Sequence, residues 1–195
     1  MDRVSIAKAA CDLVVKGLGL NLSDPNLSNT PDRLQRMYAD ELCSSLEKES
    51  PVLTKFPNGE KYDEIVLLDN IPFTSLCSHH FLPFSGRAWF AYVPYLSLVG
   101  ASKVARLIHY YSKKPQLQEA LGIEIVDHFI KELHPKGVML VMRAVHGCMS
   151  CRGVMTGFDA GMTTSVLRGC FKEDARTRAE AMALIQLSIT DRGYR

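Results

Sequence analysis

Apolar residues at helical spacing dominate the first part of the chain. They recur with this period over residues 3–17, and Gly17 and Gly19 end the pattern. A second helix is predicted to begin at Thr30 as N-cap, with Pro31 in the first helical position. Residues 49–61 hold prolines and a glycine and are typical of a linker. We therefore expect an N-terminal helical region over residues 1–60.

The pattern changes after the linker, where β-branched and aromatic residues form short runs. Strands are predicted at 64–68, 86–94, 137–146 and 162–168, and helices at 101–112, 115–133 and 177–189. Paired strands before and after paired helices favour an α+β fold, in which an antiparallel sheet carries helices on one face. Residues 61–195 are the predicted extent of this second domain.

Charge and composition exclude several classes of protein. The 195 residues include 23 Lys and Arg and 21 Asp and Glu, a net charge of +2. Such a balance argues against a nucleic-acid-binding or membrane-surface protein. No apolar run approaches the ~18 residues of a transmembrane helix, and the N-terminus is typical of an amphipathic helix rather than a signal peptide. A cytoplasmic location is the expectation.

Two clusters of cysteine and histidine suggest metal chemistry. Cys77 and His80 are three residues apart, and Cys148 and Cys151 repeat that spacing about 70 residues later. Thiolate and imidazole donors in one chain favour zinc. Four ligands would make a closed structural site, whereas three would leave a position for water. The spare imidazoles of His79 and His146 favour the open, catalytic alternative.

Longer motifs resemble GTP cyclohydrolase I, in order from about residue 30 to 180. They are TPDRLQRMY, SLCSHHFLPFSGRAWFAYVP, VGASKVARLI, KKPQLQEALG, AVHGCMSCRGV and TTSVLRGCF. The resemblance implies the tunnelling fold, with a four-stranded antiparallel sheet and two helices on one face, here preceded by an N-terminal helical pair. It also implies a homodecamer of two stacked pentamers, with active sites between subunits.

The same resemblance implies a zinc-dependent hydrolase. The expected reaction converts GTP to 7,8-dihydroneopterin triphosphate and formate, the first step towards tetrahydrofolate and other pterins. The Zn²⁺ ligands would be Cys77, His80 and Cys148, and Cys151 would not bind the metal. His146 would protonate N7 of the guanine ring, and His79 and Ser102 would assist the later ribose steps.

Substrate-binding residues follow from the resemblance in the same way. Glu119, with Gln118 beside it, would accept hydrogen bonds from N1–H and the 2-amino group of guanine, a donor pair that adenine lacks. Basic residues would bind the triphosphate, and two of them, Arg33 and Arg36, would come from a neighbouring subunit. The others are Lys103, Arg106 and Arg152.

Two features leave alternatives open. Ser78 stands where the family usually has glutamate, which allows a non-catalytic nucleotide-binding or structural zinc protein. Relatives of the same fold include nitrile reductases that use a cysteine nucleophile and NADPH. Finally, strand alternation predicts that His146 and Cys148 lie on one face, which would place the imidazole beside the metal.

Overall fold

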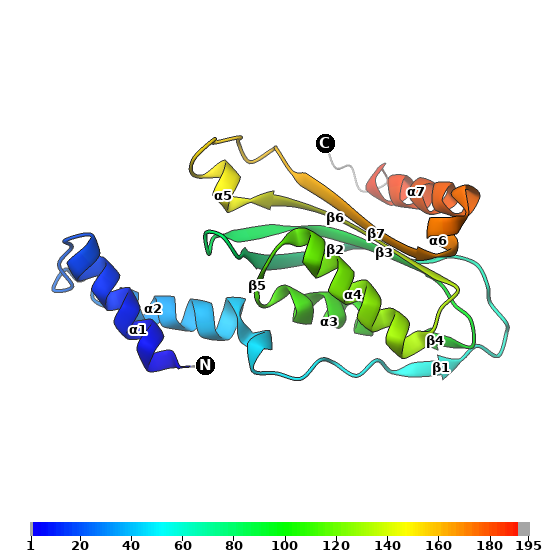
Figure 1. Cartoon of the computed structure of the whole chain (residues 1–195), viewed down its shortest axis with the longest axis horizontal. Coiled ribbons are helices and arrows are strands. Elements are labelled where there is room, and N and C mark those ends of the chain that lie inside the picture. The colour runs from blue at the N-terminus through cyan, green and yellow to red at the C-terminus, as the bar shows by residue number, and fades with distance from the viewer. Residues whose placement is uncertain (1, 191–195) are drawn as a thin grey trace.

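A five-stranded sheet forms the body of the chain in the computed structural model, which describes residues 2–190. Four strands run antiparallel to their neighbours, and a fifth, very short one lies parallel at one edge (Figure 1). In spatial order they are β5 (Pro115–Gln116), β2 (Val66–Cys77), β3 (Pro83–Val93), β6 (Gly137–His146) and β7 (Met162–Gly169). The predicted antiparallel sheet is confirmed.

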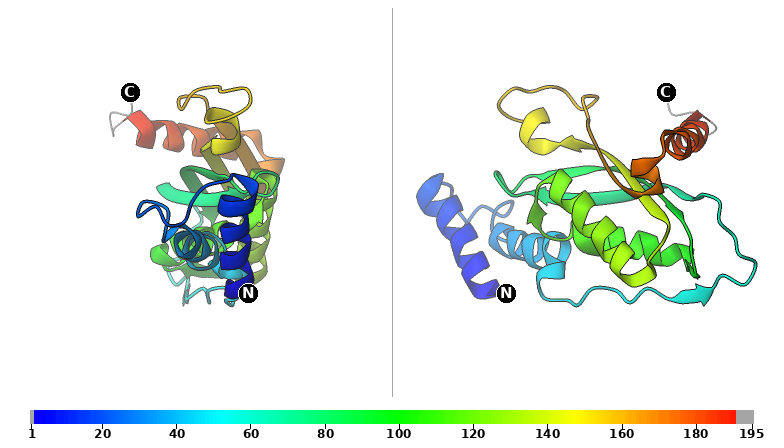
Figure 2. Two further views of the ribbon diagram at one scale, coloured as in Figure 1. Left: turned by 90° about the vertical axis from the view of Figure 1, so that its left-hand side faces the viewer. Right: turned by 45° about the vertical axis from the view of Figure 1, so that its right-hand side comes forward.

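Helices cover both faces of this sheet. Two of them, α3 (Ala101–Ser112) and α4 (Gln118–Leu133), pack on one face over a core that includes Phe84, Phe90 and Leu140. On the other face, α6 (Cys170–Glu173) and α7 (Ala175–Thr190) pack over a second core. Trp89 and Val141 belong to it, with other residues at every second position of β3 and β6. Figure 2 shows α7 separated from α3 and α4 by the sheet. The two helices expected on one face are α3 and α4, and α7 adds a layer on the other face that the prediction did not include.

The alternation of side chains along β3 and β6 explains this double core. Phe90 and Leu140 are in register and fully buried on the α3 and α4 face. Trp89 and Val141 are also in register and are buried on the α7 face. Successive residues of a strand point to opposite faces, so these apolar runs support a helix layer on each side.

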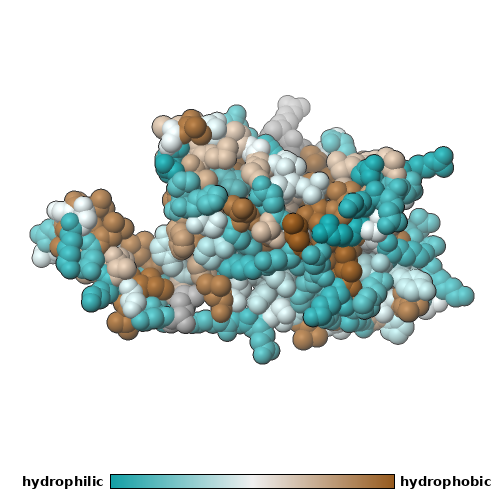
Figure 3. All heavy atoms as spheres, viewed as in Figure 1, coloured by the Kyte–Doolittle hydropathy of each residue, from teal (hydrophilic) through white to brown (hydrophobic). Residues whose placement is uncertain are grey.

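The N-terminal region is helical, as predicted. It contains α1 (Arg3–Asp12), α2 (Thr30–Arg36) and three short turns of π- or 3₁₀-helix: η1 (Leu13–Gly17), η2 (Met37–Leu42) and η3 (Ser44–Leu46). Thr30 is the first residue of α2, so the prediction of Thr30 as N-cap is wrong, and Asn29 takes that position without a side-chain hydrogen bond. These helices extend to one side of the sheet, and Figure 3 shows apolar side chains on their surface.

The predicted linker contains a strand of its own. β1 (Lys55–Pro57) pairs with β4 (Ser97–Val99) in a separate two-stranded sheet. The partner lies about 40 residues away, so local sequence carries no signal for this pairing. The domain boundary at residue 60 stays a prediction. Within residues 2–190, no helix combines the length and apolarity needed to cross a bilayer.

Candidate active site

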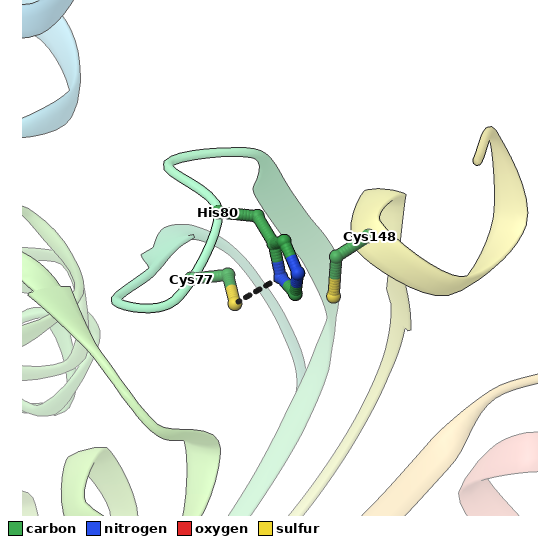
Figure 4. Close-up of side chains that lie close together, drawn as sticks. All are labelled: Cys77, His80 and Cys148. Carbon is green, nitrogen blue, oxygen red and sulfur yellow. Dashed lines mark hydrogen bonds between the residues drawn. The ribbon is translucent and has the colours of Figure 1, made fainter. Parts of the chain in front are cut away.

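Three sequence-distant side chains converge at one end of the sheet. Cys77 ends β2, His80 lies in the turn that follows, and Cys148 lies in the short helix α5 (Gly147–Ser150). One donor atom from each lies within 4.8 Å of the other two. Cys77 Sγ and His80 Nδ1 are 3.9 Å apart, and the Cys148 thiol points into the same space (Figure 4). The structure thus joins the two clusters that the sequence predicted.

The turn between β2 and β3 positions the first two donors. The Phe81 N–H donates to the Cys77 carbonyl at 2.9 Å, and the Cys77 N–H donates to the Leu82 carbonyl at 2.9 Å. Phe81 takes a positive φ of 54°, which reverses the chain after only a few residues. The ring of Tyr38 in η2 packs edge-on against Phe81 at 6.2 Å, so the N-terminal region supports this turn.

The donor set fits a divalent soft metal such as zinc. Burial, the hydrogen bond with Cys77 and the charge of Cys77 all raise the pKa of the Cys148 thiol. Two thiolates this close repel each other, and a cation held between them removes that repulsion. Sulfur and imidazole donors together are the usual ligands of zinc.

Cys151 lies outside this group of donor atoms. Its thiol is exposed and donates to the Gly147 carbonyl at 2.7 Å. The geometry therefore favours three protein donors over the closed four-ligand alternative. Three protein ligands leave one position of a tetrahedral metal for water or substrate.

His146 directly precedes α5, two residues before Cys148, and does not belong to this group. Its ring stacks on Phe84 with 4.5 Å between centroids and 1° between planes. Its Nε2 lies 2.9 Å from Gln118 Oε1. Burial lowers the pKa of His146, and the charge of Glu119 opposes that shift. The ring is thus fixed on two sides and held towards its neutral form.

The expectation that strand alternation places His146 and Cys148 on one face is wrong. β6 ends at His146, and Cys148 already lies in α5. A helical turn, with its i to i+3 and i+4 neighbours, replaces the two-residue period of a strand at this point. The pairing of β6 with β3 sets His146 opposite Phe84, at the end of the sheet where β2 reaches Cys77.

Gln118 orients His146. Its side chain is 1% exposed, and its Nε2 lies within 3.2 Å of three acceptors. These are the carbonyls of Met142 and Met162 and the hydroxyl of Thr164. The amide nitrogen must face them, so the amide oxygen faces His146 and accepts the Nε2 proton. Sequence reasoning missed this contact and the Phe84 stack; the strand register is the signal that could have revealed them.

Glu119 follows Gln118 in the first turn of α4 but points elsewhere. It is exposed and lines a cavity of about 650 Å³ along the free edge of β7. Arg168, Lys172 and Arg178 line the same cavity, which therefore carries three cationic side chains and one carboxylate. Gln118, which precedes Glu119 in the chain, contacts His146, so this side of the cavity lies one residue from the His146 contact.

The other predicted residues divide into two groups. His79 and Arg152 are near the metal group: the His79 ring lies 6.2 Å from that of His80, and the charge of Arg152 lowers the pKa of Cys148. Arg33 and Arg36 are exposed on α2. No contact of their side chains with the metal group is seen within residues 2–190.

Ser102, Lys103 and Arg106 lie at the opposite end of the sheet. They occupy the first turns of α3, which begins beside β1 and β4 (Figure 1). Just before α3, the Val99 N–H donates to the hydroxyl of Tyr92, near the end of β3, at 3.4 Å. Cys77, by contrast, lies beside the beginning of β3, where its N–H donates to the Leu82 carbonyl. About nine residues of strand separate the two ends, about 30 Å. One chain alone does not bring these residues to the metal group.

The family model described as GTP cyclohydrolase I matches residues 7–186. GTP cyclohydrolase 1 of Acetivibrio thermocellus is 39% identical to the chain, with 95% of the chain and 98% of that protein covered. The Caldanaerobacter subterraneus protein of the same name is 41% identical, with 95% and 97% covered. Among solved structures, the apo archaeosine synthase QueF-Like is 13% identical. The match covers 54% of this chain and 94% of the synthase chain. Its TM-score of 0.45 is too low to establish a common fold. On the sequence matches, this chain belongs to the GTP cyclohydrolase I family of hydrolases.

Proposed function

We propose that the chain hydrolyses GTP to 7,8-dihydroneopterin triphosphate and formate, the first step of tetrahydrofolate and pterin synthesis. The observation that carries this proposal is the junction of three metal donors, His146 and Glu119 at one end of the sheet. A metal site, a proton donor and a carboxylate for guanine are the groups that the reaction needs. Zinc is the proposed metal, held by Cys77, His80 and Cys148.

Each protein group has a distinct task in this reaction. When bound, zinc supplies a Lewis acid that activates water near neutral pH for attack on C8 of guanine. Gln118 holds the ring in place through Nε2–H, so Nδ1 of His146 is the atom that takes up the proton lost by the attacking water and delivers it to N7 as the ring opens. Glu119 accepts hydrogen bonds from N1–H and the 2-amino group. Gln118, with both ends of its amide engaged, supports the base only indirectly, through His146. His79 and Ser102 assist the later steps at the ribose.

The triphosphate requires cations from more than one chain. Arg152 is close to the metal group in the same chain, but Lys103 and Arg106 lie at the far end of the sheet. We therefore propose that a neighbouring copy supplies Ser102, Lys103 and Arg106, and that Arg33 and Arg36 also reach the site from a neighbour. This arrangement fits the tunnelling fold, closed into pentamers that stack as a homodecamer. GTP is the only other proposed partner, without nucleic acid or membrane, and the proposed location is cytoplasmic.

Incubation of the zinc-loaded protein with GTP tests the proposal. We expect formate release and a pterin that fluoresces after oxidation. His146→Ala should keep zinc and lose turnover by ~10²–10⁴-fold, because it removes a general acid. Cys151→Ser is the matched control and should keep both zinc and turnover.

Three outcomes would contradict the proposal or a part of it. Binding of GTP without formate release would favour a non-catalytic nucleotide-binding protein, the alternative that Ser78 leaves open because the family usually has glutamate there. NADPH oxidation with a nitrile substrate, in place of formate release, would favour the nitrile reductase alternative. Loss of zinc in Cys151→Ser would favour the alternative of a closed structural site with four protein ligands.

A further inference from the structure

A second cavity lies on the sheet face opposite α3 and α4. It has a volume of about 590 Å³ and lies beyond the described end of α7, where no helix of residues 2–190 covers β3 and β6. Arg87 and Trp89 of β3, Arg143 and Val145 of β6, and Ile189 near the end of α7 contribute to its lining. None of these residues belongs to the metal group, His146 or Glu119. The cavity is thus separate from the candidate active site.

Two arginines face each other in this cavity. Arg87 and Arg143 are register partners on β3 and β6, so their side chains leave the same face directly opposite each other. Like charges in that position destabilise a sheet. Within residues 2–190, no ion pair joins either guanidinium to a carboxylate. An anion placed between them would relieve the repulsion and accept their hydrogen bonds.

The Arg143 guanidinium is held in place. Its Nη2 donates to the Asp159 carbonyl at 3.2 Å. A Cβ on Gly161 would lie 2.8 Å from Nη1, so glycine there leaves room for the guanidinium to pack against the backbone. Asp159 also lines the cavity, which leaves two cationic side chains against one carboxylate. The balance of charge favours an anionic ligand.

Trp89 forms part of the apolar wall of the cavity. It follows Arg87 on the same strand face, is 9% exposed, and lines the cavity. Its Nε1 is buried and has no hydrogen-bond partner in the part of the chain described, residues 2–190. A buried donor without a partner is unfavourable, and native proteins rarely keep one without a reason. Nε1 is closed to solvent, so an acceptor oxygen in the cavity reaches it only after the indole ring turns.

We propose that this cavity binds a small organic anion that carries one oxyanion group on an apolar body. The two guanidiniums would hold the carboxylate or phosphate group. The apolar lining, formed by the Trp89 ring with Val145 and Ile189, would receive the rest of the ligand. Pockets for small ligands commonly combine an apolar lining with a few placed polar groups in this way.

The single tryptophan of the chain provides the test. Benzoate and phenyl phosphate, titrated into the zinc-loaded full-length protein, should change Trp89 fluorescence saturably, and calorimetry should give the same affinity. Arg87→Gln and Arg143→Gln should each weaken binding at least tenfold, and Arg143→Lys should restore part of it. Arg176→Gln, an exposed change on α7 outside the cavity lining, is the matched control and should bind as wild type.

Several results would overturn the proposal. One is neither heat nor a fluorescence change with either probe up to roughly 10 mM, a concentration that detects even millimolar affinity. If benzyl alcohol binds as tightly as benzoate, the charge of the ligand does not contribute to binding. If inorganic phosphate binds as tightly as phenyl phosphate, the apolar part of the ligand does not contribute. Another is binding of the probes by a variant truncated after Thr190 but not by the full-length chain. That result would mean that the chain's own residues occupy the cavity in place of a ligand.

Discussion

At the scale of single residues, Gln118 and Glu119 are adjacent in sequence but have opposite surroundings. The first is 1% exposed with its amide engaged by His146 and three acceptors, and the second is exposed in the β7 cavity. A helix turns its side chains by about 100° per residue, so two neighbours can support a catalytic ring and contact a substrate at once.

Replacing Glu119 by glutamine tests the guanine contact. The Glu119→Gln amide presents an N–H₂ group where guanine also presents donors, and an unmatched buried donor costs about 1–3 kcal/mol. We expect KM for GTP to rise about 10- to 100-fold, measured by formate release. Zinc content should stay unchanged. A KM like that of wild type would remove Glu119 from the guanine site.

His128 provides a pH-dependent contribution to stability, away from the metal. Burial lowers the pKa of His128, and its Nδ1 lies 2.9 Å from the Tyr111 hydroxyl. Because the folded-state pKa lies below that of the unfolded chain, the unfolded chain binds more protons as pH falls through about 6.5. Stability should therefore decrease as the pH falls below that value.

A comparison with His128→Gln isolates this contribution. We expect the loss of stability between about pH 7.5 and pH 5.5 to be smaller in the variant than in wild type. Urea unfolding at both pH values, followed by far-UV circular dichroism, measures the difference. An equal loss in the two proteins would show that His128 does not contribute.

At the scale of elements, the sequence predicts some strands and helices well and others poorly. The strand at 137–146 and the helix at 101–112 have the bounds that the apolar pattern predicts. β2, by contrast, continues to Cys77, far beyond the predicted end at residue 68. Asn70 takes a positive φ of 54° at a bulge, and Pro72 lies two residues later. Both residues are typical of turns, and only pairing with β3 keeps this segment extended.

The candidate site shows the same division between local and long-range information. Cys77, His80 and Cys148 could be chosen from residue type and spacing, since few side chains bind zinc. The stack of His146 on Phe84 and its contact with Gln118 depend on the register of β3 with β6 and on where α4 begins. No local pattern encodes that register. Pro115 and Gln116 likewise form β5 rather than the first turn of the predicted helix.

Gly86 tests how tightly β3 and β6 are joined. A Cβ at this position would lie 1.8 Å from the Arg143 carbonyl oxygen, which is backbone and cannot move aside. We expect Gly86→Ala to lower the free energy of unfolding by about 1–3 kcal/mol, the usual effect of overpacking. Gly59→Ala is the matched control, since a Cβ added there would meet no atom within 4 Å. Equal unfolding midpoints in urea for the two variants would contradict the close approach.

At the scale of the whole molecule, the chain has surfaces that suit further copies of itself. Val4 is 78% exposed and Leu13 56% exposed on the N-terminal helices, which extend beyond the sheet (Figure 1). β7 is an edge strand along its whole length, and Glu119 lies beside it. Unpaired strand edges and exposed apolar groups are features that association removes. The proposed oligomer would cover both surfaces.

Mixing of inactive variants tests whether neighbouring copies share each active site. His146 lies beside the metal group, whereas Arg106 lies on α3 towards the other end of the sheet. A His146→Ala chain therefore keeps the proposed phosphate contacts, and an Arg106→Glu chain keeps the proposed proton donor. When the two are dissociated, mixed equally and reassembled, roughly a quarter of the sites should receive both intact parts from different chains across a repeating heterologous interface. Formate release should rise accordingly above that of either variant alone.

The matched control combines two changes on the same side of one chain. Glu119 and His146 are neighbours through Gln118, so a mixture of Glu119→Gln and His146→Ala chains never forms a site with both residues intact. Formate release by that mixture should not exceed the sum of the rates of the two variants measured separately. Native mass spectrometry must show mixed oligomers in both experiments. If the Arg106→Glu mixture then fails to recover, Arg106 does not act across the interface, and the phosphates must be bound by cations of the chain that holds the metal, of which Arg152 is the nearest candidate.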